Sequence, residues 1–171
     1  MPLRWVKKRL HRLALRVFGA LPRAIRRAIV RVVAPSWTAG ALAIIERDDG
    51  RWLVVKPAYR KGWALPGGLL NKGEHPEAGV RRELREELGL NVVILGEPWV
   101  VFDAGLRRID VVFRSAPAPG FDLDSLSVTS AELLDSRWID PDDPPFLEGE
   151  AQDVLALRRR VVEGGDSVLV L

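Results

Sequence analysis

Residues 68–90 read Gly-Leu-Leu-Asn-Lys-Gly-Glu-His-Pro-Glu-Ala-Gly-Val-Arg-Arg-Glu-Leu-Arg-Glu-Glu-Leu-Gly-Leu. Proline is tolerated in the first turn of a helix and glycine is a common stop, so the stretch predicts a helix from about Pro76 to Leu88, ended by Gly89. Aliphatic residues recur at helical spacing and form a stripe that can anchor this helix on a sheet: Val80, Leu84 and Leu88.

Three carboxylates share one face of this helix, Glu83, Glu86 and Glu87, because a helix advances about 100° per residue and these three fall within an arc of roughly 100°. They repel one another unless a cation neutralises them. Mg²⁺ and Mn²⁺ suit the task, since hard cations prefer carboxylate and water oxygens and bridge to substrate phosphates. Pro66-Gly67-Gly68 has the backbone freedom to bring a carbonyl close to the same ion. The alternative is a solvated helix decorated with Glu–Arg pairs.

The pattern of the whole segment displaces that alternative. It resembles the Nudix box, G-x5-E-x7-R-E-U-x-E-E-x-G-U with U an aliphatic residue, and residues 63–68 are similar to the approach common in that family. The resemblance implies an α/β fold, the Nudix α/β/α sandwich with a mixed sheet, over about residues 37–163. Nine constrained positions match: Gly68, Glu74, Arg82, Glu83, Leu84, Glu86, Glu87, Gly89 and Leu90.

The resemblance also implies roles for these residues. The metal ligands would be the Gly68 carbonyl with Glu83, Glu86 and Glu87, and Arg82 would orient a glutamate, so that the three glutamates and Arg82 form the catalytic set. Glu74 would be an outer carboxylate. Mg²⁺, or Mn²⁺, would neutralise a diphosphate and lower the pKa of a bound water.

The carboxylate that takes the water's proton is left open by the sequence. Glu86 is the first choice inside the box, and Glu148 or Glu150 are the candidates outside it. Glu150 is equally suited to the first turn of a final helix, where the helix dipole favours an acid.

Substrate-binding residues are sought among cations and aromatics near the glycine turn. Lys56, Arg60 and Lys61, with Arg47, are candidates for the phosphates, although each can be a plain surface charge. Trp63 is a candidate for base stacking, as are Trp37, Trp99 and Phe102, although aromatics near strands are more often core.

Two subclass markers of the family are absent after the box. The region Ala104-Gly105-Leu106-Arg107 lacks the proline of ADP-ribose-type members and the tyrosine of the diadenosine polyphosphate type, and the only tyrosine is Tyr59. Both subclasses lose weight, and the natural substrate stays open.

Composition excludes several other kinds of chemistry. The chain has 171 residues, which suits one main domain, and it has no cysteine and two histidines. Thiolate catalysis and zinc–thiolate or histidine-rich sites are therefore excluded. The absence of cysteine fits a reducing cytoplasm, where we expect the protein.

The N-terminal arm, residues 1–35, differs sharply from the rest. Of the chain's 26 basic and 23 acidic residues, ten basic and no acidic ones lie in it, which leaves a net charge of −7 for residues 36–171. Apolar residues at spacings of three and four predict two amphipathic helices, over about 3–17 and 24–33, outside the hydrolase domain at 36–171. Neither has the apolar run of a membrane span.

This arm has three interpretations. Its stripes pack on the domain or on a second subunit; or it lies on an anionic membrane surface, with Trp5 and Phe18 in contact, which would make the protein peripheral to the membrane; or it contacts nucleic acid. Dimers are frequent in the family, so a homodimer is also expected.

The remaining elements follow from apolar runs and turn residues. Strands are predicted at 37–46, 51–56, 91–95, 99–103, 108–114 and 137–139, loops at 57–75, 116–120 and 140–145, and a final helix at 150–163.

Three functional hypotheses result. The first is a metal-dependent pyrophosphohydrolase that cleaves a phosphoanhydride bond in a nucleoside diphosphate linked to another moiety. The second is the same domain targeted by its arm to membrane or RNA. The third is a Nudix-fold module that senses a nucleotide without hydrolysing it, against which the intact box argues.

Overall fold

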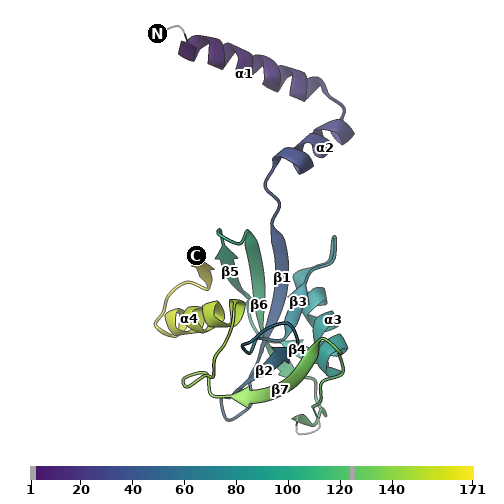
Figure 1. Ribbon diagram of the computed structural model, residues 1–171, viewed down its shortest axis with the longest axis vertical. Coiled ribbons are helices and arrows are strands. Elements are labelled where there is room, and N and C mark those ends of the chain that lie inside the picture. Colours follow the sequence, from purple (N-terminus) through teal and green to yellow (C-terminus); the bar gives the residue numbers. More distant parts are fainter. Residues whose placement is uncertain (1–2, 124–125) are drawn as a thin grey trace. The chain divides into compact units, whose positions relative to one another are not determined.

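The computed structural model describes residues 3–123 and 126–171, with the side chains of the first helix described from Lys7 onward. The chain divides into two compact units, with the boundary between Ser36 and Trp37. The first unit consists of α1 (Leu3–Ala20) and α2 (Arg23–Val33), shown in Figure 1, which confirms the two predicted helices. Within the described residues, no helix is both long and apolar enough to cross a membrane. Trp5, a candidate for membrane contact, has a side chain outside the described part.

The second unit is built on a mixed sheet. Its strands run in the order β3-β1-β6-β5-β8, with β4 pairing β6 at one end, and a separate antiparallel pair joins β2 to β7. The β1–β6 and β5–β8 pairs are parallel and the others are antiparallel. The bounds are β1 Thr38–Ile45, β2 Trp52–Pro57, β3 Gly67–Leu69, β4 Val92–Ile94, β5 Trp99–Asp103, β6 Arg108–Pro117, β7 Leu133–Ile139 and β8 Val168–Val170.

Two helices cover opposite faces of these strands and make the two outer layers, with the strands as the middle layer (Figure 1). Side chains alternate between the faces of a strand, so β1 and β2 supply both cores. Ala41, Ala43 and Ile45 pack with α3 (Pro76–Leu88), whereas Leu42 and Ile44 pack with α4 (Glu150–Val162). The result is the expected α/β/α sandwich with a helical arm.

The helix α3 has the predicted bounds for the predicted reasons. Its N-cap is His75, whose Nδ1 accepts a hydrogen bond from the Glu77 N–H at 3.3 Å, and Pro76 occupies the first turn. Gly89 ends it in the left-handed conformation with φ of 62°, and its N–H donates to the Arg85 carbonyl at 3.0 Å. Val80, Leu84 and Leu88 are buried, as the stripe required.

Four elements differ from the sequence prediction. β3 lies inside the predicted loop 57–75, because Gly67–Leu69 pairs with β1 despite having little strand propensity. β6 runs on to Pro117, into the predicted loop 116–120, because β4 pairs with its end. β7 begins at Leu133 rather than 137, since its whole length pairs with β2. β8, not predicted, adds to β5.

The pairing of β3 with β1 brings two backbones very close at Gly67. Its φ is 131°, and a Cβ there would lie 2.2 Å from the Ala41 carbonyl oxygen and 2.9 Å from the Leu42 Cα. Neither atom can move away, because both belong to the backbone of β1, which is paired on both of its edges. Only glycine is compatible with this position.

We expect Gly67→Ala to lower the free energy of unfolding by at least about 3 kcal/mol, since it combines an unfavourable φ with a backbone clash. Gly50→Ala is the matched control: its φ is 81° and nothing lies within 4 Å of the added Cβ, so only strain of about 1 kcal/mol is expected. Urea unfolding of the two variants measures both values. Equal losses would contradict the close approach of β3 to β1.

Candidate active site

A cavity of about 400 Å³ opens between the glycine turn, α3 and the first turn of α4. Its charged lining residues form two groups by their contacts: the acidic wall, made largely of the predicted box, and the basic wall, made of two arginines and the acid that pairs with them. The charged lining residues are Arg82, Glu83, Glu87 and Glu132 in the first group and Arg60, Arg108 and Glu150 in the second. Cavity and box thus coincide.

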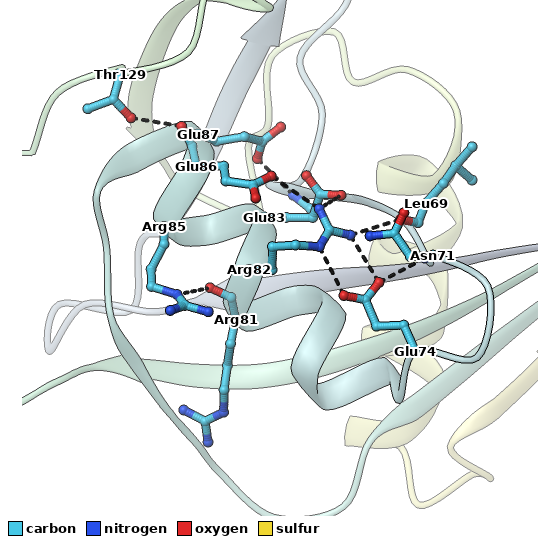
Figure 2. A network of polar contacts seen from close by, with 11 residues as sticks. Leu69, Asn71, Glu74, Arg81, Arg82, Glu83, Arg85, Glu86, Glu87 and Thr129 are labelled. Carbon is cyan, nitrogen blue, oxygen red and sulfur yellow. Dashed lines mark hydrogen bonds and ion pairs between the residues drawn. The ribbon is translucent and has the colours of Figure 1, made fainter.

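Arg82 lies at the centre of the box (Figure 2). Its Nε and Nη2 donate to the two oxygens of Glu74 at 2.9 and 3.0 Å, and its Nη1 donates to Glu83 at 2.8 Å and to Glu86 at 3.1 Å. Nη2 also reaches the Leu69 carbonyl at 3.2 Å. One guanidinium therefore joins three carboxylates and the last residue of β3.

Glu74 is held as an anion by these contacts. The Arg82 hydrogen bonds, and then the Asn71 N–H at 2.8 Å, lower the pKa of Glu74 to about 2. Both of its oxygens are committed to this pairing. In this arrangement it acts as an outer carboxylate that fixes Arg82.

Glu87 faces the turn before the helix. Its Oε2 accepts a hydrogen bond from the Gly67 N–H at 3.1 Å. Burial, and then the like charge of Glu83 and Glu132, raise the pKa of Glu87 to about 7 despite that hydrogen bond. A carboxylate in this position favours any added positive charge.

The fit of a hard cation can be tested on Gly68. A Cβ at this residue would lie 2.6 Å from Oε1 of Glu83, so only glycine lets the turn approach that carboxylate. Carboxylates and a backbone carbonyl form an all-oxygen donor set, which suits Mg²⁺ or Mn²⁺. Among the described residues no three acidic or histidine side chains converge on one point, because Arg82 and the Gly67 N–H hold oxygens of the glutamates. The residues fit a divalent cation in kind.

Glu86 lies at the edge of the cavity rather than in its lining. Its side chain is 60% exposed and contacts Arg82. Its backbone carbonyl accepts from the Thr129 hydroxyl at 3.0 Å, and the Glu87 carbonyl accepts from the Thr129 N–H at 2.9 Å. These bonds fasten the segment before β7 to the end of α3.

The same segment brings Glu132 to the cavity, a residue that the sequence prediction missed. It is exposed and lines the cavity beside Glu87, whose pKa its charge helps to raise. Within residues 3–123 and 126–171 its carboxylate has no ion pair. The sequence gives no signal for it, because it stands outside every motif.

The basic wall is a network of ion pairs around Glu150. Arg60 donates to its two oxygens at 2.7 and 2.9 Å, and Arg108 reaches it at 2.6 Å. Arg108 also pairs at 2.8 Å with Asp110, which is buried. Burial alone would raise the pKa of Glu150, but the two arginines hold it below its usual value. Glu150 is therefore poorly suited to accept a proton. It is a first-turn acid of α4 that orients two cations.

The other predicted residues are placed as follows. Of the four substrate-binding candidates, only Arg60 lines the cavity. Lys56 donates to the carbonyls of Lys61 and Gly62, and Lys61 is exposed. The guanidinium of Arg137 lies over the Trp63 ring, with its Cζ 4.1 Å from the ring centroid. Trp63 also packs against the core cluster that includes residues of α4.

Four further candidates also lie away from the cavity lining. Arg47 stands over the ring of Trp138. Trp37 stacks on Phe102 with ring centroids 4.4 Å apart. Glu148, a candidate base, accepts a hydrogen bond from the Gly62 N–H at 2.7 Å and so holds the loop between β2 and β3.

Known proteins resemble this chain in sequence. The family profile described as NUDIX domain matches residues 37–161. A MutT-like protein of Streptomyces ambofaciens is 33% identical over 109 residues, which cover 64% of this chain and 68% of that protein. The nucleoside triphosphatase NudI of Escherichia coli is 40% identical over 110 residues, 57% of this chain and 78% of its own.

Solved structures agree on the fold. A NUDIX hydrolase from Nitrosomonas europaea superimposes with a TM-score of 0.65 at 21% identity, over 80% of each chain. A MutT NUDIX hydrolase from Burkholderia pseudomallei gives a TM-score of 0.58 at 27% identity, over 71% of this chain and 98% of its own. With the box, the cavity and the sandwich in place, the chain belongs to the Nudix family of hydrolases.

Proposed function

We propose that residues 36–171 form a Mg²⁺-dependent pyrophosphohydrolase that cleaves a phosphoanhydride bond in a nucleoside diphosphate linked to another group. The observation that carries this proposal is that one cavity brings the glutamates of the predicted box together with two arginines. A polyphosphate chain can be neutralised by a divalent cation on the glutamates and by hydrogen bonds from arginines. The relative named as a nucleoside triphosphatase makes nucleoside triphosphates the first substrates to test.

The acidic wall would hold the metal. Glu83 and Glu87 line the cavity, and the Gly68 carbonyl and Glu86 stand beside them. Bound there, Mg²⁺ supplies charge neutralisation of the phosphates and a more acidic water. Arg82 keeps Glu83 in position through its pairing with Glu74.

The basic wall would hold the phosphates that lie away from the metal. Arg60 and Arg108 both face the cavity and are spaced by their shared contact with Glu150. Because their guanidinium groups are fixed before substrate arrives, little ordering is needed on binding.

The proton of the attacking water requires an acceptor. Glu132 has the position for this role, since it lines the cavity and has no ion pair among the described residues. Glu86 is the alternative within the box, although Arg82 shares its carboxylate. Proton transfer to Glu132 leaves the metal ligands unchanged.

We expect turnover of nucleoside triphosphates, nucleotide sugars or dinucleotides only with Mg²⁺ or Mn²⁺ present. Glu83→Gln or Glu87→Gln should lower kcat at least about a hundredfold, because each removes a charged ligand. Glu77→Gln is the matched control on the same helix, since Glu77 pairs with Arg81 outside the cavity lining. The rate of release of phosphate and nucleoside monophosphate measures the metal dependence and the kcat of each variant.

No turnover from a folded protein that still binds nucleotide would overturn the enzymatic proposal. That result would favour the alternative of a nucleotide sensor.

We expect Glu132→Gln to lower kcat by roughly 10²–10⁴, the range for loss of a general base. The affinity for Mg²⁺ and KM should change little. Glu86→Gln, tested beside it, should weaken Mg²⁺ binding instead. If Glu86→Gln lowers kcat by this factor at saturating Mg²⁺ and Glu132→Gln does not, Glu86 is the base.

The raised pKa of Glu87 predicts a pH dependence of stability in the metal-free protein. The pKa of Glu87 in the folded state, about 7, lies above the ordinary 4.5. The contribution of Glu87 to folding stability is therefore fully present below pH 4.5 and is lost as the pH rises through about 7. Between about pH 5 and about pH 8 the wild type should lose more stability than Glu87→Gln. Thermal unfolding without and with Mg²⁺ measures this, and Mg²⁺ should stabilise the wild type more at the higher pH. Identical pH profiles for wild type and variant would contradict the prediction.

A further inference from the structure

The arm helix α2 (Arg23–Val33) is divided lengthwise into an apolar half and a cationic half. At about 100° per residue, six of the seven apolar side chains fill one continuous half of the helix surface. They are Ala24, Ala28, Val32, Ile25, Ile29 and Val33, and the other half carries Arg23, Arg26, Arg27 and Arg31, with Val30 among them. Helices with such a face normally bury it against a core.

This apolar half is exposed. Val32 is 85% and Val33 76% accessible, and Ile25 and Ile29 are also exposed. Apart from the half-buried Arg26, every residue of α2 is exposed. A contiguous apolar surface of this kind marks a contact with something apolar.

The helix α1 repeats the pattern over its described side chains. Leu10, Leu13 and Val17 are 61%, 59% and 56% exposed and lie on one side at helical spacing. Basic residues four apart occupy another side: Lys8, Arg12 and Arg16. The two helices therefore present the same chemistry.

Charge identifies the kind of partner. Residues 1–35 carry ten basic and no acidic residues, so the partner is anionic. A nucleic acid would use the arginines but leave the aliphatic half in water. A bilayer of anionic lipids accommodates both, since lipid phosphates meet the cationic side and the boundary with the acyl chains takes up the apolar side.

We propose that α1 and α2 bind in the plane of an anionic lipid surface and tether the hydrolase domain to it through the segment Ala34-Pro35-Ser36. The apolar side chains insert at the level of the headgroups, and the arginines and lysines contact lipid phosphates. This function is separate from the proposed catalysis, because it uses only residues outside the cavity and the family domain.

The experiment is co-sedimentation of the full chain with vesicles. One set contains phosphatidylcholine and phosphatidylglycerol in equal parts, and the other contains phosphatidylcholine alone. Binding is expected to the anionic set, with at least about tenfold weaker partitioning to the neutral set, since each basic residue near such a surface contributes roughly fivefold. About 0.5 M NaCl should reduce it, because the screening length falls to roughly 4 Å.

Two variants separate the faces. Ile25→Gln/Ile29→Gln/Val33→Gln keeps every charge, and glutamine is a better helix former than the residues it replaces. Arg23→Gln/Arg26→Gln/Arg27→Gln/Arg31→Gln keeps the apolar half. Each should lower partitioning at least about tenfold. The matched control, lysine at the same four arginine positions, should bind as the wild type does.

Thermal unfolding of the hydrolase domain should be unchanged in all three variants, which separates lost binding from lost folding. If the wild type does not co-sediment with anionic vesicles, the proposal is wrong. That result would favour packing of the apolar faces against protein. If the apolar variant binds like the wild type while the Arg→Gln variant does not, the arm binds through its charges alone. In that case displacement by a single-stranded RNA would identify a nucleic-acid partner and also overturn the proposal.

Discussion

The pairing of Arg82 with Glu74, Glu83 and Glu86 is the interaction on which the site depends. Four glutamates lie around one short turn and one helix face, and their mutual repulsion would otherwise open the structure. A planar guanidinium with donors in fixed directions can serve several carboxylates at once, which a lysine cannot. By also holding the Leu69 carbonyl, Arg82 fixes the end of β3 to α3, beside the carboxylates proposed to hold the metal.

The two walls of the cavity differ in how their carboxylates are neutralised. On the basic wall, two arginines neutralise Glu150 and Asp110, so buried charges are paired. On the acidic wall, Glu87 accepts only a backbone N–H among the described residues, and burial beside other carboxylates raises its pKa. Charge is thus balanced at the arginines proposed to bind an anion and left incomplete at the glutamates proposed to bind a cation.

The sequence predicted what local patterns determine. Helical spacing placed Glu83 and Glu87 on one face and Val80 beneath them, and the cap residues gave the bounds of α3. It could not predict β3 or β8, because short strands of glycine or terminal residues exist only through their partners. Arg108 and Glu132 were missed for the same reason: strand pairing and the Thr129 contacts, distant in sequence, bring them to the cavity.

The distribution of charge makes substrate recognition local. Residues 36–171 carry a net charge of −7, so their overall field repels a nucleotide rather than attracting it. Beyond a screening length of about 8 Å at physiological salt this repulsion is weak, and attraction must come from groups in contact with the phosphates. Arg60 and Arg108, which line the cavity, are the groups proposed for this task, together with a cation on the glutamates. The proposed phosphate binding and the proposed binding of the arm to a lipid surface use different residues, which can be varied independently.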